Sequence, residues 1–497
     1  SGPVKLMLVS GAPGIGKSAI INEIHKPIVR QRGYFISGKF DQFQGSVPYI
    51  ALIRAFRELI RQILTENEES IVSWKSKIQT ALGKNGQVVI DIIPELELII
   101  GKQKPVQSLS PAESQNRFNM VFLNFVRVFS QKDHPLVIFL DDLQWADSGS
   151  LNMMNLFLTG QKAKYLLIIG AYRDIEVVAG GTFSKTMENI KEKGVNIDEL
   201  YLDPLNLEVI ESIISDTFYC DEEQATDLGQ LVFEKTGGNP FFVNEFIKTL
   251  HKKKLVRFDQ AKGEWLWSIN DIRKLETTEN VVDLMIDRIK VLDPAVQEVL
   301  KIAACIGGEF DLKTLSIVLE KNPTETAGLL LVAIQEGLLE PIGSNYKQML
   351  NNEFEPVEPG SEAISQVVKK VRYRFLHDRI QQAAYSFISD EKKQDTHYRI
   401  GFLLYENSSA NQLEDAIFDV VNQMNLGLNL FESKTEKLAL ARLNLIAGRK
   451  AKASSAYDMA VDYLKIAHMQ LDQNCWLSFF QLTFDINKEL AECNYLV

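Results

Sequence analysis

The fold of this chain is decided near its N-terminus by Gly11-Ala12-Pro13-Gly14-Ile15-Gly16-Lys17-Ser18, which has the spacing G-x-x-x-x-G-K-S. Glycines allow the backbone to turn so tightly that successive N–H groups point at one phosphate, and the start of the following helix adds partial positive charge. Lys17 is expected to reach the β- and γ-phosphates of a nucleotide, and the Ser18 hydroxyl to bind Mg²⁺. The residues from Gly11 to Ala19 are therefore predicted to hold a nucleoside phosphate.

A second signal is an apolar run that ends in two carboxylates. Val137-Ile138-Phe139-Leu140 is followed directly by Asp141 and Asp142. Asp141 is expected to hold Mg²⁺ through water, and Asp142 to orient or deprotonate the attacking water. The alternative is a strand that ends in a solvated turn, which is common for a single Asp. Together with the phosphate-binding loop, the two carboxylates predict a site that hydrolyses a nucleoside triphosphate.

Residues 4 to about 175 alternate short apolar runs with amphipathic stretches, which indicates a parallel sheet covered by helices. Apolar residues at helical spacing are found in Tyr49–Leu64 and Glu113–Val128. The strands are expected at Lys5–Val9, Tyr34–Gly38, Leu136–Leu140 and Tyr165–Ala171. The pattern alone predicts a nucleotide-binding α/β domain.

The rest of the chain is expected to be mainly helical. Residues 205–275 contain short helices, a break at Gly237-Gly238-Asn239-Pro240, and a hairpin formed by Leu255–Phe258 and Trp265–Ile269. Residues 280–390 are expected to form helices and then the strands Gly337–Ile342 and Val371–Phe375, an order that resembles a winged helix. Beyond 390 only helices are expected, similar to the start of a tetratricopeptide-like array. The predicted domains are a P-loop domain at 4–200, a helical lid at 201–279, a winged helix at 280–390 and a helical-repeat region at 391–497.

Several motifs resemble those of one family. Asp141-Asp142-Leu143-Gln144-Trp145-Ala146-Asp147 resembles the extended Walker B segment of the STAND family, the signal-transduction ATPases with numerous domains. These are regulatory relatives of AAA-type ATPases. Gly170-Ala171-Tyr172-Arg173-Asp174 continues the resemblance, which implies that Arg173 senses the γ-phosphate. The alternative is a surface Arg that pairs with a nearby Asp.

Two later motifs extend the resemblance. Gly238-Asn239-Pro240 is similar to the family's G-x-P motif, which implies that Pro240 packs near the adenine; a helix-breaking turn is the alternative. Phe375-Leu376-His377-Asp378 is similar to its Met-His-Asp motif, with Leu376 where Met is usual. That similarity implies that His377 contacts the β-phosphate of ADP, whereas a helix cap or a packing residue is the alternative. Ser37-Gly38-Lys39-Phe40-Asp41-Gln42 also resembles this group.

The resemblance implies a regulatory ATPase switch that binds ATP or ADP with Mg²⁺. ADP would keep the domains closed, ATP would stabilise an open form that self-associates, and slow hydrolysis would reset the switch. The most similar modules belong to large bacterial proteins in which a Ser/Thr kinase domain precedes, and sensor and histidine kinase domains follow. One alternative is an AAA-type ATPase whose winged helix binds duplex DNA, but the expected recognition helix near Thr324–Glu336 has no Lys or Arg. A second alternative is a small-molecule kinase that uses the same phosphate-binding loop, but the lid and the helical tail have no evident role in that chemistry.

The composition is that of an ordinary globular protein. Of 497 residues, 45% are hydrophobic and 24% are charged, which excludes wholesale disorder. The formal net charge of −11 argues against a chain-wide grip on nucleic acid or anionic lipid. The four cysteines have no metal-type spacing, and no apolar run is long enough for a membrane span, so a cytoplasmic location is expected. Ser1-Gly2-Pro3 and the helical pattern of Glu489–Val497 lead us to expect a piece of a longer protein.

Overall fold

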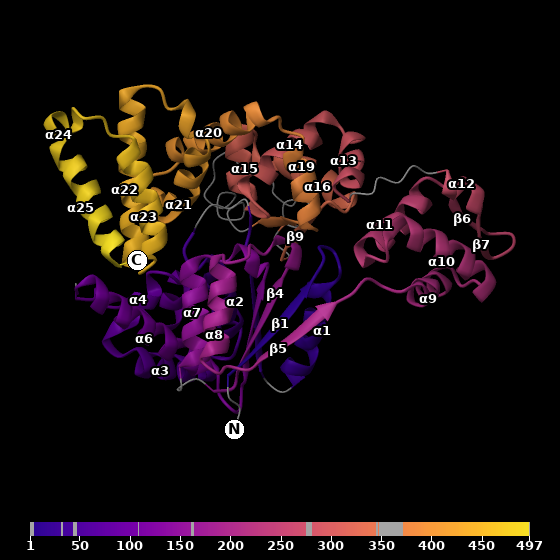
Figure 1. The fold of residues 1–497 in the computed structure, drawn as a ribbon, viewed down its shortest axis with the longest axis horizontal. Helices are drawn as coiled ribbons and strands as arrows, with labels where there is room; N and C mark the ends of the chain where they lie inside the picture. Colours follow the sequence, from indigo (N-terminus) through magenta and orange to yellow (C-terminus); the bar gives the residue numbers. More distant parts are fainter. Residues whose placement is uncertain are drawn as a thin grey trace.

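The computed structural model describes residues 4–30, 33–42, 47–107, 109–160, 164–274, 281–343, 346 and 371–496. Its first unit is a five-stranded parallel sheet with the strand order β2-β3-β4-β1-β5 (Figure 1). The strands are β1 (Lys5–Gly11), β2 (Tyr34–Lys39), β3 (Leu136–Asp141), β4 (Leu166–Tyr172) and β5 (Ile197–Leu202). The predicted fold class is therefore confirmed, and the four predicted strands are present with ends that differ by one or two residues.

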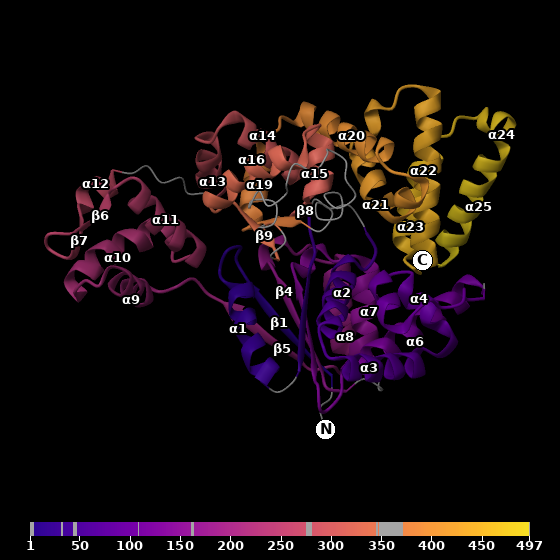
Figure 2. The ribbon, with the colours of Figure 1, turned by 180° about the vertical axis from the view of Figure 1, so that it is seen from behind.

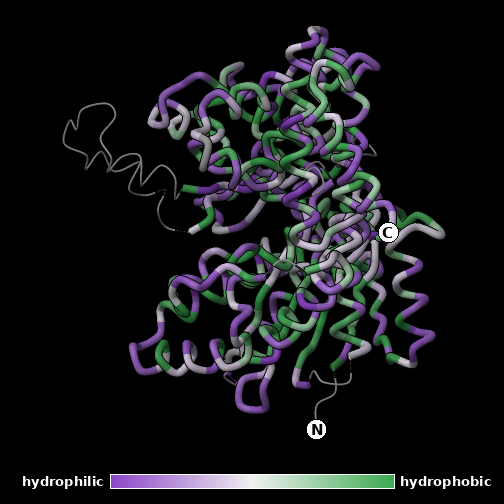
Figure 3. Tube along the Cα trace, turned by 90° about the vertical axis from the view of Figure 1, so that its left-hand side faces the viewer, coloured by the Kyte–Doolittle hydropathy of each residue, from purple (hydrophilic) through white to green (hydrophobic). Residues whose placement is uncertain are grey.

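The sheet is buried on both faces because helices cover each of them. Helix α1 (Lys17–Arg30) packs on one face through Ile21, against strand residues such as Val9 and Phe139. The other face, with Leu8 and Ile138, packs against a larger set of helices. These are α2 (Ile50–Leu64), α6 (Pro111–Phe129), α7 (Ser148–Thr159) and α8 (Thr182–Glu192). Burial on both faces explains why the inner strands β3 and β4 are largely apolar. Figure 3 shows stretches of hydrophobic chain inside the lower part of the molecule.

Strand β5 was not predicted from the sequence. It lies at the edge of the sheet beside β1, and its sequence IDELYL has two adjacent acids, Asp198 and Glu199, in place of a continuous apolar run. The predicted end of the first domain at residue 200 falls inside this strand, so the sheet domain runs on to Leu202. Between β2 and β3 the chain also forms α3 (Glu68–Leu82), α4 (Gly86–Ile90) and α5 (Glu97–Ile100).

Gly38 in β2 shows how closely α2 approaches the sheet. A Cβ atom at this position would lie 2.0 Å from the carbonyl oxygen of Ala51, a backbone atom that cannot turn away. We expect Gly38→Ala to lower the free energy of unfolding by about 2 kcal/mol or more, measured by urea denaturation. The control is Gly328→Ala in an exposed helical turn, where no described atom lies within 4 Å of the new Cβ. A Gly38→Ala protein as stable as the control would contradict this account of the packing.

The second unit, here named the lid, contains α9 (Leu207–Phe218), α10 (Glu222–Thr236), α11 (Pro240–Lys252) and α12 (Ile269–Arg273). The predicted hairpin is present as β6 (Val256–Asp259) paired with β7 (Glu264–Trp267). The predicted break is also present, because Gly237 ends α10 in the left-handed conformation and the Asn239 side chain caps α11. The lid lies to one side of the sheet in both views (Figure 1, Figure 2).

The third unit runs from α13 to α19 and contains a small antiparallel sheet with the order β8-β10-β9. Two of its helices precede β8, two lie between β8 and β9, and another follows β10. The assignment of this unit as a winged helix stays a prediction. Strand β8 was not predicted because it has only three residues. The elements are α13 (Val281–Lys290), α14 (Pro294–Ile306), β8 (Glu309–Asp311), α15 (Leu312–Leu319), α16 (Pro323–Gln335), β9 (Leu339–Ile342), β10 (Arg372–Phe375) and α19 (Asp378–Ser386). The predicted boundary at 279 lies outside the described residues.

The C-terminal part, here named the tail, consists of helices. They are α20 (Asp390–Glu406), α21 (Ala410–Leu426), α22 (Lys434–Ala453), α23 (Tyr457–Met469), α24 (Cys475–Ser478) and α25 (Phe480–Leu496). The hydrophobic core of the sheet domain continues into the tail through residues such as Phe418 and Tyr457. The third unit lies above the ends of the parallel strands, and the tail lies above the helices at one side of the sheet (Figure 1). None of the helices that the structure describes has the length and apolar character needed to cross a bilayer.

Candidate functional site

The phosphate-binding loop joins the end of β1 to the start of α1. Gly14 and Gly16 have φ angles of +78° and +99°, which favour glycine over any residue with a Cβ atom. The Lys17 ammonium folds back over the loop and donates to the carbonyl oxygens of Gly11 at 2.8 Å and Ala12 at 3.0 Å. Burial lowers the pKa of Lys17. The loop therefore has the glycine-dependent backbone that the motif predicts. Two carbonyl oxygens of the loop hold the Lys17 ammonium.

Ser18 and Asp141 meet as the sequence predicts for a metal site. The Ser18 hydroxyl donates to Asp141 Oδ2 at 2.7 Å and so links the start of α1 to the end of β3. Magnesium commonly takes one or two protein oxygens and completes its shell with water and phosphate, and this pair fits that role. Among the described residues, no group of three or more His, Cys, Asp or Glu side chains could hold a metal ion independently of a nucleotide.

Asp142 is the most constrained carboxylate of the site. Its φ angle is 57°, and its side chain is held by Gln144 Nε2 at 2.9 Å, Arg173 Nε at 3.0 Å and Lys39 Nζ at 3.3 Å. Burial and the neighbouring charge of Asp141 raise the pKa of Asp142 to about 7, although Lys39 and Arg173 oppose the shift. A carboxylate with a pKa near neutrality is suited to accept a proton from water.

Arg173, at the end of β4, is surrounded by carboxylates. It forms ion pairs with Asp142, the residue after β3, with Glu176 at 3.1 Å, and with Asp378 of the third unit. Burial disfavours its charge, but the three carboxylates outweigh burial and raise the pKa of Arg173. Arg173 therefore pairs with nearby acids, which was the alternative to its predicted γ-phosphate contact; the contact itself stays a prediction.

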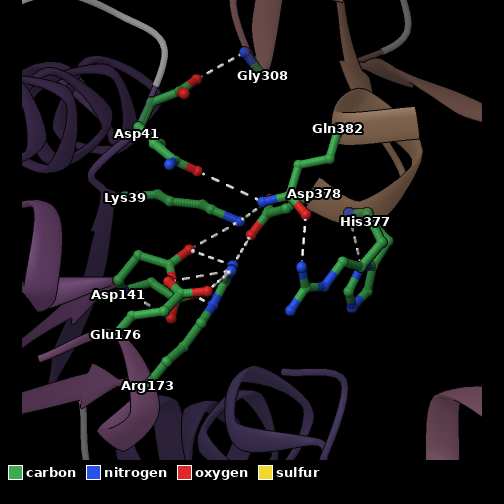
Figure 4. A network of polar contacts seen from close by, with 12 residues as sticks. Lys39, Asp41, Asp141, Arg173, Glu176, Gly308, His377, Asp378 and Gln382 are labelled. Carbon is green, nitrogen blue, oxygen red and sulfur yellow. Dashed lines mark hydrogen bonds and ion pairs between the residues drawn. The ribbon is translucent and has the colours of Figure 1, made fainter. Parts of the chain in front are cut away.

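Asp378 connects the third unit to the sheet domain (Figure 4). One of its carboxylate oxygens pairs with Lys39 of β2, and the other pairs with Arg173, which follows β4. Burial disfavours the charge of Asp378, but Lys39 and Arg173 outweigh burial and hold the pKa of this carboxyl well below its usual range. Asp41 adds a further contact by accepting the backbone N–H of Gly308 at 2.6 Å. We name the contacts of Asp378 with Lys39 and Arg173 the latch.

His377 lies beside the latch but has a structural role. Its Nδ1 accepts the backbone N–H of Arg379 at 3.1 Å, which caps α19. Its ring packs on Phe241 of the lid, with 4.2 Å between ring centroids. Burial lowers the pKa of His377 to about 4, so the ring is neutral at physiological pH. These are the cap and the packing contact given above as the alternative; the predicted phosphate contact stays a prediction.

The lid contacts the phosphate-binding loop through the residues on either side of Pro240. Asn239 Nδ2 donates to the carbonyl oxygen of Pro13 at 2.9 Å. The backbone N–H of Phe241 donates to the carbonyl oxygen of Gly14 at 3.3 Å. Pro240 itself begins α11, where its fixed φ angle suits the first helical turn. The G-x-P motif is thus placed against the loop, whereas a contact of Pro240 with adenine stays a prediction.

Comparison with known proteins agrees with this geometry. Residues 1–169 match the AAA ATPase domain family. The chain carries an AAA-type P-loop ATPase domain. The predicted relation to AAA-type P-loop ATPases is thereby confirmed. A solved STAND protein with a tetratricopeptide repeat sensor, from Pyrococcus horikoshii, is similar to the chain at 13% identity and a TM-score of 0.44, covering 99% of this chain and 62% of that one.

The relatives to which the chain is similar include histidine kinases of eukaryotes. Hybrid signal transduction histidine kinase G of Dictyostelium discoideum is 30% identical, over 100% of this chain and 17% of that protein. Peroxide stress-activated histidine kinase mak3 of Schizosaccharomyces pombe is 21% identical, over 68% of this chain and 16% of that protein. The chain thus spans about a sixth of the length of these relatives. The bacterial setting expected from the sequence is not supported by them.

The structure brings together the predicted residues of the ATPase domain and adds others. Ser18, Asp141, Asp142 and Arg173 surround one end of the sheet, as the motifs imply. Lys39 and Asp378 were not predicted as site residues, although both lie in stretches that carry the family resemblance. Asn239 and Phe241 were not predicted as loop contacts, because the G-x-P motif indicates only Pro240 between them.

Proposed function

We propose that the chain is a STAND-type regulatory switch, in which ATP or ADP with Mg²⁺ binds at the Gly11–Ala19 loop and controls whether the third unit stays docked on the ATPase domain. The observation that carries the proposal is the latch, because Asp378 of the third unit is bound by Arg173 of the ATPase domain. The order of motifs along the chain supports it, as does the match of residues 1–169 to AAA ATPase domains.

Because of the latch, docking of the third unit and binding of a γ-phosphate would compete for the Arg173 guanidinium. Arg173 directs its guanidinium donors at Asp142, Glu176 and Asp378. A triphosphate needs the donors that Asp378 holds, whereas a diphosphate does not reach them. ADP is therefore compatible with the docked state and ATP favours release of the third unit, which is the differential affinity that a switch requires.

Hydrolysis would return the switch to its docked state. Ser18 and Asp141 would hold Mg²⁺, which neutralises phosphate charge when bound. Asp142 would orient the attacking water and accept its proton, because it is buried beside Asp141 with a pKa raised to about 7. We propose slow turnover, since the same Asp142 is engaged by Lys39 and Arg173 while the latch is closed.

The tail is placed to report a signal to the third unit. His397 of α20 hydrogen-bonds Gln423 of α21 at 2.7 Å and the Tyr385 hydroxyl at 3.0 Å, and Gln423 donates to the carbonyl oxygen of Cys305 at 2.8 Å. A rearrangement of the tail would therefore strain the unit that carries Asp378. We further propose that the open form self-associates, that kinase and sensor domains flank this region in the whole protein, and that it acts in the cytoplasm.

Binding of duplex DNA by the third unit is not favoured by its charges. Helix α16, the predicted recognition helix, contains no Lys or Arg. Arg372 and Arg374 on the small sheet are paired with Glu309 and Glu340. Duplex binding depends on free cations that face phosphates. Because these arginines are paired with glutamates, they support ion pairs within the third unit and not a DNA contact.

The proposal is tested by Asp378→Asn, which keeps the shape of the side chain and removes the charge from the latch. If the latch contributes about 1.4 kcal/mol to docking, ADP release accelerates about tenfold, and light scattering with ATP shows a larger mass. Release is measured by stopped-flow fluorescence of a labelled ADP.

The control for this test is Asp390→Asn. Asp390 also begins a helix and pairs with a lysine, Lys393, but it lies on the surface of the tail. An unchanged ADP release rate together with an unchanged mass in Asp378→Asn would overturn the proposed switch.

A further inference from the structure

Lys39 is the last residue of β2 and lies beside the Walker B carboxylates. Its Cα is in register with that of Asp141 on the adjacent strand β3. Its ammonium is 3.3 Å from Asp142 Oδ2 and pairs with Asp378. The side chain remains 45% exposed, so it reaches the site from its solvent side. No step of the proposed hydrolysis described above uses Lys39.

Lys39 and Arg173 form a pair of cations on opposite sides of β3. They end β2 and follow β4, the two strands that flank β3 in the sheet. Between them lies the Asp378 carboxylate, with Oδ1 bound to Lys39 and Oδ2 to Arg173. Two cations that each hold one oxygen of the same anion form an oxyanion site. Both cations belong to the ATPase domain (Figure 4), so departure of Asp378 would leave them in place.

This oxyanion site lies next to the residues expected to hold the phosphates and Mg²⁺, where the γ-phosphate of a triphosphate would end. Asp141, in register with Lys39, is bonded to Ser18 at the start of α1. Arg173 is close enough to Lys17 of the phosphate-binding loop to act on its charge. Lys39 thus lies beside the metal-binding Asp141, and Arg173 lies near the lysine of the phosphate-binding loop. When the third unit undocks, the Asp378 carboxylate leaves Lys39 and Arg173, and the γ-phosphoryl group of a triphosphate would take its place.

We propose that Lys39 determines the preference for nucleoside triphosphate over diphosphate: together with Arg173 it binds the Asp378 carboxylate in the docked state and the γ-phosphoryl oxygens of ATP in the undocked state. This inference rests on the proposed nucleotide switch. Asp378 acts as an internal anion that competes with the γ-phosphate for both cations. ADP has no group to place there and leaves the pair to Asp378.

The test separates the two roles of Lys39 by first removing the latch. In an Asp378→Asn background, Lys39 has no carboxylate of the third unit to pair with. Titration with Mg²⁺ and either ADP or the non-hydrolysable analogue adenylyl imidodiphosphate gives the two dissociation constants. Adding Lys39→Met is expected to weaken binding of the analogue about tenfold or more, as for loss of a charge-assisted hydrogen bond. ADP binding is expected to stay within about twofold.

Further variants control for folding and for general charge. Lys39→Arg is expected to keep the triphosphate preference, and Lys39→Gln to lose it as Lys39→Met does. Lys191→Met removes an exposed lysine of the same domain, paired with Glu199, and is expected to change neither constant.

Three results would overturn the inference. Equal weakening of ADP and the analogue by Lys39→Met would show a general electrostatic effect, and no change in either would limit Lys39 to the latch. If neither the starting protein nor Asp378→Asn binds any nucleotide, the proposed switch itself fails, and the role of Lys39 fails with it.

Discussion

Asp142→Asn is expected to lower the rate of ATP hydrolysis about a thousandfold, within the range typical for loss of a general base. Asn keeps the size of the side chain, tolerates the positive φ angle of 57° at this position and can still accept hydrogen bonds from Gln144 and Arg173. It cannot take a proton from water. Because Asp142 does not belong to the phosphate-binding loop, nucleotide affinity is expected to change little. Phosphate release in a single turnover, at saturating ATP and Mg²⁺, measures the effect.

The matched control is Asp147→Asn in the same segment. Asp147 caps α7 by accepting the backbone N–H of Ser150 at 2.9 Å, and Asn caps helices equally well. Its hydrolysis rate should equal that of the starting protein. An Asp142→Asn protein that hydrolyses ATP within tenfold of the control would show that another group activates the water.

Lys17→Ala is expected to weaken nucleotide binding about a hundredfold, so that the purified protein carries no nucleotide. The Lys17 ammonium is held over the loop by two carbonyl oxygens of that loop, where it is placed to turn toward a phosphate. A charge-assisted hydrogen bond to phosphate contributes about 1.5–3 kcal/mol, and the ammonium can make two of them. Denaturing the protein and quantifying the released nucleotide by chromatography gives the occupancy directly.

Lys26→Ala provides the comparison for this variant. Lys26 lies on the same helix α1, is exposed and pairs with Glu23. It should retain the nucleotide content of the starting protein. Stoichiometric nucleotide in Lys17→Ala would reject the Gly11–Ala19 loop as the binding site, whatever the result for Asp142.

The local parts of the site were predictable because their signals are contiguous. The loop from Gly11 to Ser18 carries its function in its own backbone and in the two residues that end it, so spacing alone identifies it. The inner strands were predictable for a related reason: burial on both faces demands an apolar residue at every position. Strand β5 is partly exposed and contains the adjacent acids Asp198 and Glu199, so its sequence IDELYL gave no such signal.

The contacts between units were not predictable in this way. Lys39 and Asp378 are 339 residues apart in the chain, and each one alone resembles an ordinary charged residue at the end of an element. For His377 the structure shows a helix cap and a place against Phe241, and the phosphate contact that the motif implied stays a prediction. Asn239 reaches Pro13 only because the lid folds back over the loop.

The sequence by itself determined the phosphate-binding loop, the carboxylates that end β3 and the parallel sheet that holds both, because periodicity and spacing within a few residues encode local backbone structure and burial. The tertiary structure alone decided that Asp378 lies between Lys39 and Arg173. That placement depends on how the third unit docks on the strand ends. Docking is set by the shape and charge of surfaces assembled from distant segments, and no local pattern in the chain records it.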